Sequence, residues 1–256
     1  VSAKEKARIA AGLRLESQID HALSVDISKD FGLESANFSC SYAGSDRWCT
    51  YNKRGGGSNA LYNPNSTADI KSQTSGCIRG NCVKLTGGYM FIPALPDPLV
   101  DDIFADGGGI SLWFKQDNTN QITGPRILVT KSGSYKNNGY SLAVLDANQI
   151  EFSLGKTSSN LYVWSSPVGS VRFNSWNHVA VVYNRNSTAN TPLVYVNGRL
   201  MQLTRNGTWD GGYTEITAGL PNEVGLGAES PSGGKRFYGW LDEIRIYSTD
   251  TAFQNL

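Results

Sequence analysis

The stretch WNHVAVVYN, residues 176–184, is apolar at nearly every position. Successive side chains of a β-strand point to opposite faces of the sheet, so a strand of this composition is apolar on both faces. We therefore expect other parts of the chain to cover it on both sides. The next stretch, PLVYVNGRLMQL at 192–203, holds Asn197 and Gly198 between alternating apolar residues, and this pair predicts a β-hairpin.

Other stretches show the same strand signals. In GISLWFKQ, residues 109–116, one face carries Ile110, Leu112 and Phe114, and the other carries Ser111, Trp113 and Lys115. Further short stretches are bounded by turn residues: VKLTGGYMFI (83–92), RILVTKSG (126–133), YSLAVLD (140–146), QIEFSLG (149–155), LYVWSS (161–166), EVGLGAE (223–229) and GWLDEIRIYS (239–248). Many short, evenly spaced strands predict a mainly β fold, a two-sheet antiparallel sandwich of jelly-roll type.

Composition limits the classes of partner. The chain has 256 residues, with 23 Lys and Arg against 22 Asp and Glu. This near balance argues against nucleic acid or an acidic membrane surface as a partner. No apolar run approaches the roughly 20 residues that span a bilayer, and no signal peptide is visible. We expect contact with a membrane only through a segment preceding Val1.

The four cysteines fall into two local pairs, Cys40 with Cys49 and Cys77 with Cys82. Short loops close at modest entropic cost, so two local disulfides are the simplest arrangement. Zinc is the rival interpretation, although the spacings lack the close CxxC pairs of structural zinc sites. Disulfides would indicate an oxidising compartment outside the cytoplasm.

The chain begins with a different pattern, rich in Ala, Lys and Arg. We expect one helix over residues 1–23, capped by Ser2 with Glu5 three residues later. Its apolar stripe comprises Ile9, Leu13, Leu15, Ile19, Ala22 and Leu23, and the charged residues Glu5, Lys6, Arg8, Arg14 and Glu16 are expected off it. The predicted domains are a stem helix (1–25), an irregular connecting region of loops and short strands with a disulfide loop (26–76), and the sandwich (77–256).

The order of the strands resembles that of laminin-G-like, concanavalin-A-like jelly rolls over roughly residues 77–248. The most specific motifs are WNHVAVV, VYVNGRL and LDEIRIY, between Trp176 and Tyr247. The segment GCIRGNCVKLTGG, residues 76–88, also resembles a paired-Cys hairpin found ahead of the first core strand in bacterial members. This resemblance implies the jelly-roll fold.

The N-terminal stretch KEKARIAAGLRLESQIDHAL, residues 4–23, resembles the soluble half of a type IV pilin or pseudopilin helix. The resemblance implies filament assembly, with other pilin subunits as partners. The assembly residues would be Ile9, Leu13, Ile19 and Leu23, which would contact both the sandwich and neighbouring stems.

Catalytic motifs are not recognisable in the sequence, which lacks GxSxG, HExxH and a P-loop. His178 could act as a general base, as in jelly-roll polysaccharide lyases, with Tyr247 and Lys131 as other candidates. However, His178 lies in the middle of a predicted strand, where a packed structural role is favoured. Asp242 and Glu243 are adjacent and would point to opposite faces, so they do not form a glycosidase pair. We expect no enzymatic activity.

A structural calcium ion is the cofactor that the resemblance implies. The Asp that opens the last strand is a frequent ligand in glucanase-like members, and here it corresponds to Asp242. Backbone oxygens near Gly87 and Gly88 could complete a shell of six to eight oxygens. Tyr89 and Met90 replace the acidic residues that usually follow, which counts against the site.

Aromatic side chains are the remaining candidates for ligand contact. In LYVWSS, Leu161 and Val163 are expected to face the core. Tyr162 and Trp164 would then face outward and could stack on sugars or bind a protein surface. The full set of candidates is Tyr135, Tyr140, Tyr162, Trp164, Trp209 and Tyr213.

The leading hypothesis is a non-enzymatic pilin or pilin-like subunit on the bacterial cell surface. Its laminin-G-like head would serve adhesion or ligand binding, with a glycan or a cell-surface molecule as partner. The alternative is a secreted, lectin-like carbohydrate-binding module. A polysaccharide lyase is the third possibility.

Overall fold

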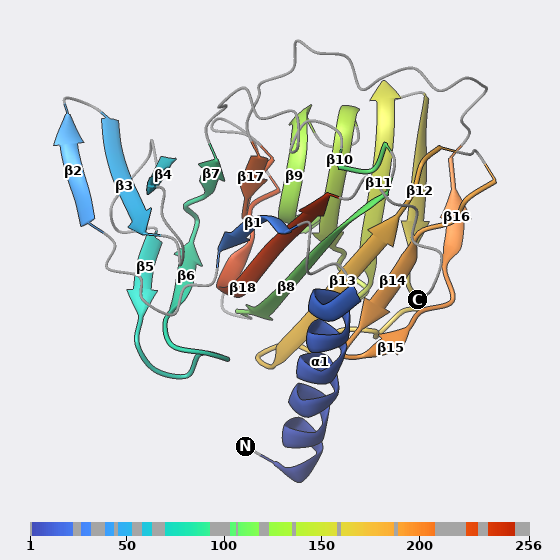
Figure 1. Cartoon of the computed structure of the whole chain (residues 1–256), viewed down its shortest axis with the longest axis horizontal. Coiled ribbons are helices and arrows are strands. Elements are labelled where there is room, and N and C mark those ends of the chain that lie inside the picture. Colours follow the sequence, from blue (N-terminus) through green and yellow to red (C-terminus); the bar gives the residue numbers. More distant parts are fainter. Residues whose placement is uncertain are drawn as a thin grey trace.

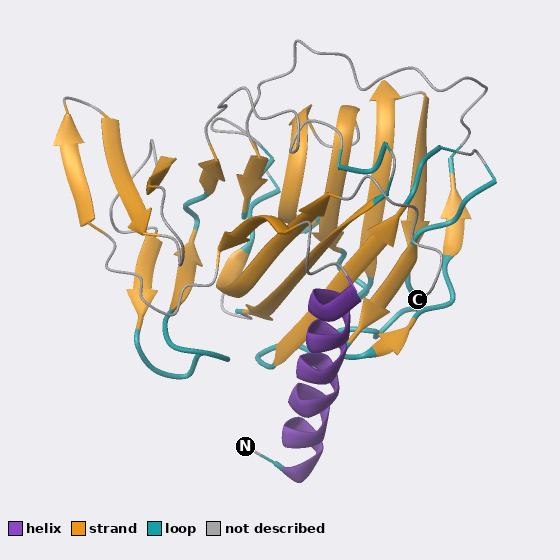
Figure 2. Ribbon diagram, viewed as in Figure 1, coloured by secondary structure: helices purple, strands orange, loops and turns teal. Residues whose placement is uncertain are grey.

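The computed structural model describes residues 2–22, 27–31, 39–43, 46–52, 58–62, 70–92, 103–105, 107–117, 123–134, 137–157, 160–186, 189–207, 224–229 and 235–248. Within these residues the chain forms one N-terminal helix and two stacked antiparallel sheets (Figures 1 and 2). The predicted fold class is therefore confirmed, and the arrangement is consistent with a jelly roll.

The larger sheet has eight strands among the described residues. They are β1 (Ile27–Phe31), β5 (Ile70–Gln73), β6 (Cys82–Thr86), β8 (Gly108–Gln116), β13 (Trp176–Tyr183), β14 (Leu193–Val196), β15 (Arg199–Leu200) and β18 (Tyr238–Ser248). Their order is β15-β14-β13-β8-β18-β6-β5. The long strand β18 pairs with β6 through its first half and with β1 through its second half.

The second sheet has seven strands within the described part of the chain, in the order β16-β12-β11-β10-β9-β17-β7. They are β7 (Met90–Ile92), β9 (Arg126–Ser134), β10 (Asn137–Val144), β11 (Ile150–Thr157), β12 (Asn160–Ser165), β16 (Thr204–Asn206) and β17 (Val224–Leu226). Apolar side chains from both sheets meet in one core. This core is what the alternating stretches of the sequence predict.

A small third sheet lies between β1 and β5 in the sequence. It consists of β2 (Ser39–Ala43), β3 (Asp46–Asn52) and β4 (Ser58–Tyr62), and β4 contacts β7. These strands lie in the region 26–76, which the sequence predicts to be irregular. Two further strands of that region, β1 and β5, belong to the larger sheet. The domain boundaries themselves stay a prediction.

The helix α1 (Ala3–Ala22) lies on the outer face of the larger sheet, on the side away from the core (Figure 1). Leu15 and Ile19 pack on Ala180 and Tyr247 of this face. The apolar outer face of β13 is thus covered by α1 while its inner face lies in the core, as its composition predicts. The Ser2 hydroxyl accepts a hydrogen bond from the Glu5 N–H at 3.2 Å, which confirms the predicted cap.

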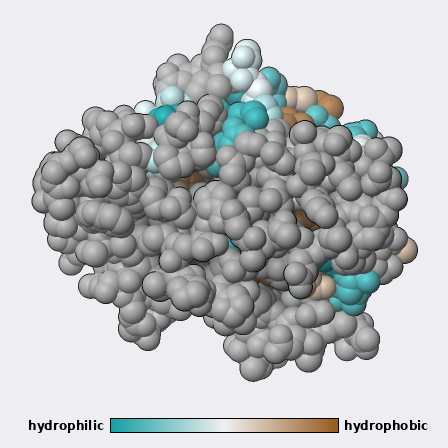
Figure 3. Space-filling model, turned by 90° about the horizontal axis from the view of Figure 1, so that it is seen from above, coloured by the Kyte–Doolittle hydropathy of each residue, from teal (hydrophilic) through white to brown (hydrophobic). Residues whose placement is uncertain are grey.

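The N-terminal turns of α1 extend past the ends of the strands of the larger sheet (Figure 1). No helix among the described residues combines the length and the apolar character that a bilayer crossing needs. On the face seen in Figure 3, the described residues form small hydrophilic patches next to smaller hydrophobic ones.

Candidate functional site

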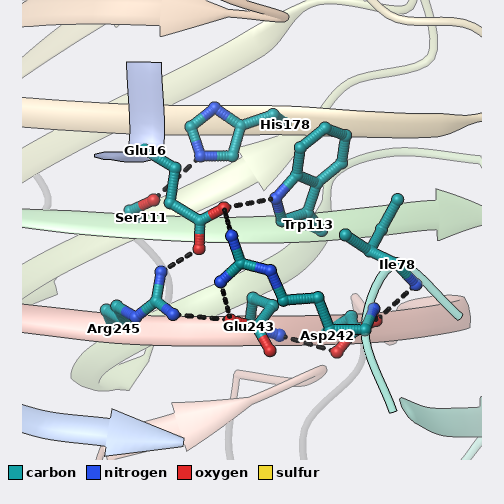
Figure 4. A network of polar contacts seen from close by, with 9 residues as sticks. Glu16, Ile78, Ser111, Trp113, His178, Asp242, Glu243 and Arg245 are labelled. Atoms are coloured by element: carbon teal, nitrogen blue, oxygen red, sulfur yellow. Dashed lines mark hydrogen bonds and ion pairs between the residues drawn. The ribbon is translucent and has the colours of Figure 1, made fainter. Parts of the chain in front are cut away.

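A buried carboxylate joins α1 to the larger sheet (Figure 4). Glu16 is fully buried, and its side chain accepts hydrogen bonds from the Arg245 guanidinium and, at 3.3 Å, from the Trp113 indole N–H. The sequence places Glu16 off the inward face, and this expectation is wrong. The spacing could have shown that Glu16 faces the sheet, because it lies four residues after Gly12 and three before Ile19, on the same face of the helix.

The ion pairs continue across the sheet. Arg245 also donates to Glu243 at 2.5 Å, and Arg79 lies 3.2 Å from Glu243 and 3.8 Å from Glu16. Two carboxylates and two guanidinium groups therefore compensate one another beneath α1. Removing one partner would leave a buried charge without compensation.

Asp242 holds the disulfide loop that contains Arg79. One oxygen of its carboxylate accepts the N–H groups of Ile78 at 2.7 Å and Arg79 at 3.3 Å, and the other accepts that of Glu243 at 2.9 Å. Burial raises the pKa of Asp242 to about 7, and these three hydrogen bonds oppose the increase. The role of Asp242 in the structure is thus to fix a loop.

The expected calcium site does not come together. The register pairs Leu241 with Val83 and Tyr238 with Thr86, so Gly87 and Gly88 lie at the opposite end of β6 from Asp242. The Gly87 carbonyl already accepts a hydrogen bond from Arg236. The grouping of these three residues as calcium ligands is therefore wrong, because the direction of β6 separates them.

The Cys77–Cys82 disulfide is confirmed, with a Cα–Cα distance of 5.5 Å. Its sulfurs lie close to the Asp242 carboxylate, but a disulfide offers no thiolate to a metal ion. Cys40 and Cys49 are directly opposite each other in the register of β2 and β3. Their side chains lie outside the described residues, and this second bridge stays a prediction.

The three candidate bases of a lyase are all buried. His178 and Tyr247 are fully buried and Lys131 is 2% exposed. His178 Nε2 hydrogen-bonds the Ser111 hydroxyl at 2.9 Å, and burial lowers the pKa of His178 to about 3. Its ring packs 5.0 Å from that of Trp113, measured between centroids. The predicted structural role of His178 is confirmed.

Three of the six aromatic candidates lie in the core. Tyr140, Tyr162 and Trp164 are each at most 5% exposed, and Trp164 stacks on Phe152 with a centroid distance of 5.8 Å. Their expected outward orientation is therefore wrong. Alternation shows that Tyr162 and Trp164 share a face, but both faces of β12 carry apolar groups, so the pattern does not say which one is inward. Tyr135, Trp209 and Tyr213 lie outside the described residues.

The assembly residues contact the sandwich itself. Ile19 is 1% exposed, and Ile9 and Leu13 pack, half-buried, against Trp113 and Trp176. The part of the prediction that places them against the sandwich is confirmed. Leu23 lies outside the described residues.

The outer face also carries a row of basic and aromatic residues that the sequence patterns do not predict. Direct cross-strand pairing aligns Lys84 of β6, Trp240 of β18, Lys115 of β8 and Trp176 of β13, and we call these four residues the Trp240 row. The Lys84 and Lys115 ammonium groups lie 4.4 Å and 4.7 Å from the centroid of the Trp240 ring. Trp240 and both lysines are half-buried. Each alternates with core residues along its strand, which is the signal that could have identified the row.

Comparison with known proteins places the chain in a family. A family model named Laminin_G_3, for the concanavalin A-like lectin/glucanases superfamily, matches residues 92–251, more than half of the chain. The chain belongs to this superfamily. Among curated protein sequences, none matches the chain.

Several solved structures are similar to this superfamily member at low sequence identity. The botulinum neurotoxin serotype C1 binding domain is 11% identical at a TM-score of 0.58, over 91% of this chain and 50% of that one. The receptor binding domain of botulinum neurotoxin D is 15% identical at 0.51, over 81% and 50%. A CBM40 module of a Ruminococcus gnavus sialidase, bound to sialyllactose, is 18% identical at 0.45, over 57% and 77%. The chain spans about half the length of the toxin domains.

Proposed function

We propose that this chain is a lectin-like domain that binds carbohydrate without cleaving it. The observation that carries the proposal is the Trp240 row, in which a half-buried indole lies between two ammonium groups on the outside of the sandwich. An indole and flexible donors are the kind of groups that hold a sugar by apolar contact and hydrogen bonds. Membership of a superfamily of lectins and glucanases supports this choice.

The burial and pairing of three carboxylates on the outer face favour a lectin function over a glucanase function. Glu16, Asp242 and Glu243, which come together in the described part of the outer face, are buried and compensated by arginines or by backbone N–H groups. A glycosidase needs two carboxylates that reach the substrate from opposite sides of the bond. These three are engaged beneath α1 and beside the disulfide loop.

The Cys77–Cys82 bridge is typical of proteins that fold in an oxidising compartment. It supports a location outside the cytoplasm, where a lectin would meet glycans.

A glycan array tests the proposal when it is combined with analysis of the glycans after incubation. We expect saturable binding to a limited set of glycans, which are recovered intact. Recovery of shortened glycans or unsaturated uronates would identify an enzyme instead. Absence of binding across the array would overturn the proposed carbohydrate-binding function.

A second candidate function is that of a pilin-like subunit, with α1 as its stem. The projection of the N-terminal turns of α1 past the sheet favours this function (Figure 1). A helix that leaves the domain in this way can connect it to an assembly. Ile9, Leu13 and Ile19 contact their own sheet, so neighbouring stems would have to bind elsewhere on α1 or upstream of it. Immunogold labelling of intact cells would place the protein along filaments if the proposal holds. Label spread over the envelope or in the medium would contradict it.

A further inference from the structure

We infer that the Trp240 row binds glycans that carry carboxylate groups, such as uronates or sialic acids. This inference rests on the proposed function and specifies the ligand class of the same site. The two ammonium groups lie within about 9 Å of each other, since each is within 5 Å of the centre of one ring. Two cations held so close attract an anion that approaches from solvent.

The surroundings of the row are also cationic. Arg8 of α1 donates to the Trp176 carbonyl at 2.8 Å, and the charge of Arg172 acts unfavourably on Arg8. Among the described residues, the carboxylates paired with these cations are Glu5, 2.6 Å from Arg8, and Asp117, 3.7 Å from Lys84. The neighbouring Glu16, Asp242 and Glu243 are already engaged by Arg79, Arg245 and backbone N–H groups. In the described part of the chain, Lys84, Lys115, Arg8 and Arg172 thus have two paired carboxylates between them, in a chain whose net charge is only +1.

Of the two lysines of the Trp240 row, Lys115 is the more available to a ligand. Among the described residues it has no ion-pair partner, whereas Lys84 is paired with Asp117. Its contact with the Trp240 ring holds the ammonium group beside the indole. A carboxylate of a bound sugar would form an ion pair with the Lys115 ammonium group. The affinity for such a sugar should therefore depend on salt concentration.

Trp240 gives the row an apolar component that a simple cationic patch lacks. It is half-buried, and its inner part packs in the cluster of Cys82, Trp113 and Trp176. This packing holds the ring in place, and the contact of both ammonium groups with the ring keeps the two charges close together. The row should therefore distinguish a carboxylated sugar from a flexible polyanion.

Titration calorimetry with four probes tests the inference. They are polygalacturonate, sialyllactose, the neutral maltohexaose and poly-L-glutamate. We expect binding to at least one of the two acidic sugars, and the pattern tells whether repeated or single carboxylates are preferred. Binding should weaken several-fold between 50 and 300 mM NaCl because salt screens the charges. Equal affinity for poly-L-glutamate or for maltohexaose would overturn the inference.

Variants of Lys115 locate the site. Lys115→Gln should weaken binding of the acidic sugar about tenfold, the effect of losing one charge-assisted hydrogen bond. Lys115→Arg keeps the charge and should retain most of the affinity. The matched control is Arg199→Gln, which removes one exposed positive charge on β15, an edge strand of the same sheet, and should leave the affinity unchanged.

Two failures are distinguishable. If the wild-type protein binds none of the sugars on an array, the proposed function itself fails. If it binds sugars, but Lys115→Gln binds them as tightly as the wild type and shows the same thermal unfolding, carbohydrate binding stands and the Trp240 row is not the site.

Discussion

Gly12 of α1 lies against the indole of Trp113, so closely that a Cβ atom on residue 12 would come within 2.5 Å of Trp113 Cη2. The same Cβ would lie 2.9 Å from the Cβ of His178. Glycine is therefore required at this position because the backbone of α1 rests directly on the sheet. The close approach brings Glu16 within reach of Arg245, one helical turn further on.

Gly12→Ala is expected to destabilise the protein although it raises helix propensity. In an exposed helix this substitution stabilises by about 1 kcal/mol. Here the methyl group would force α1 away from Trp113, and overpacking of this kind costs about 1–3 kcal/mol. Denaturant unfolding measures the change. Ala10→Gly on the exposed face is the control and should cost about 1 kcal/mol; stabilisation by Gly12→Ala would show that α1 does not rest on Trp113.

Glu16→Gln should lower the free energy of unfolding by about 3–5 kcal/mol, because the buried guanidinium group of Arg245 would then share the Glu243 carboxylate with Arg79 and one positive charge of the network would lose its compensation. Unfolding in urea checks the value. In the control, Glu229→Gln, the partner Lys235 is 35% exposed and a loss of at most about 1 kcal/mol is expected. Similar effects of the two substitutions would contradict the burial of the network.

The pH dependence of the free energy of unfolding should reveal the lowered pKa of His178. Burial lowers the pKa of His178 from 6.5 to about 3, so the unfolded chain binds the additional proton first as the pH falls. The free energy of unfolding therefore decreases between about pH 6.5 and pH 3, by up to about 1.4 kcal/mol per pH unit. Asp242, whose pKa is raised to about 7, contributes in the opposite direction between about pH 4 and pH 7.

His178→Gln removes the first of these contributions. The free energy of unfolding of the variant, relative to that of the wild type, should rise steadily as the pH is lowered from 6.5. This trend is expected whatever the difference between the two proteins at neutral pH. Thermal unfolding of both proteins from pH 3.5 to pH 8 provides the comparison. Parallel curves would mean that His178 is not buried as a neutral group.

The Cys77–Cys82 bridge closes the loop whose N–H groups bind Asp242. Replacing both cysteines by serine should cost about 2 kcal/mol, the value for a short closed loop. It should also increase proteolysis of α1, because Arg79 on this loop contacts Glu16. Unchanged proteolysis would show that the loop does not hold the helix.

A thiol titration checks the second pair. The denatured, unreduced protein should have no reactive thiol, and reduction should release four. Two thiols before reduction would refute the predicted Cys40–Cys49 bridge.

The alternation of apolar residues was sufficient to predict the two sheets, and the Asn197-Gly198 pair was sufficient to predict the β14–β15 hairpin. Both residues have positive φ angles there, 53° and 78°, as such a turn requires. These features are local, since period and turn residues act over a few positions. The apolar outer face of β13 likewise required a cover, which α1 provides.

Long-range pairing accounts for what the sequence did not predict. Nothing within LYVWSS says which face meets the opposite sheet, so the pattern alone does not predict that Tyr162 and Trp164 face the core. The Trp240 row exists only because β6, β18 and β8 are neighbours in a particular register, although these strands are far apart in the sequence. The burial of Glu16 likewise depends on Arg245, more than 200 residues away.

Hydrogen–deuterium exchange with and without an acidic sugar tests the central claim most directly. With polygalacturonate or sialyllactose, whichever binds more tightly, we predict slower exchange in the peptides that contain Lys84, Lys115 and Trp240, and no change in β10 and β11 of the opposite sheet. Slower exchange confined to that opposite sheet would contradict a binding site on the Trp240 row.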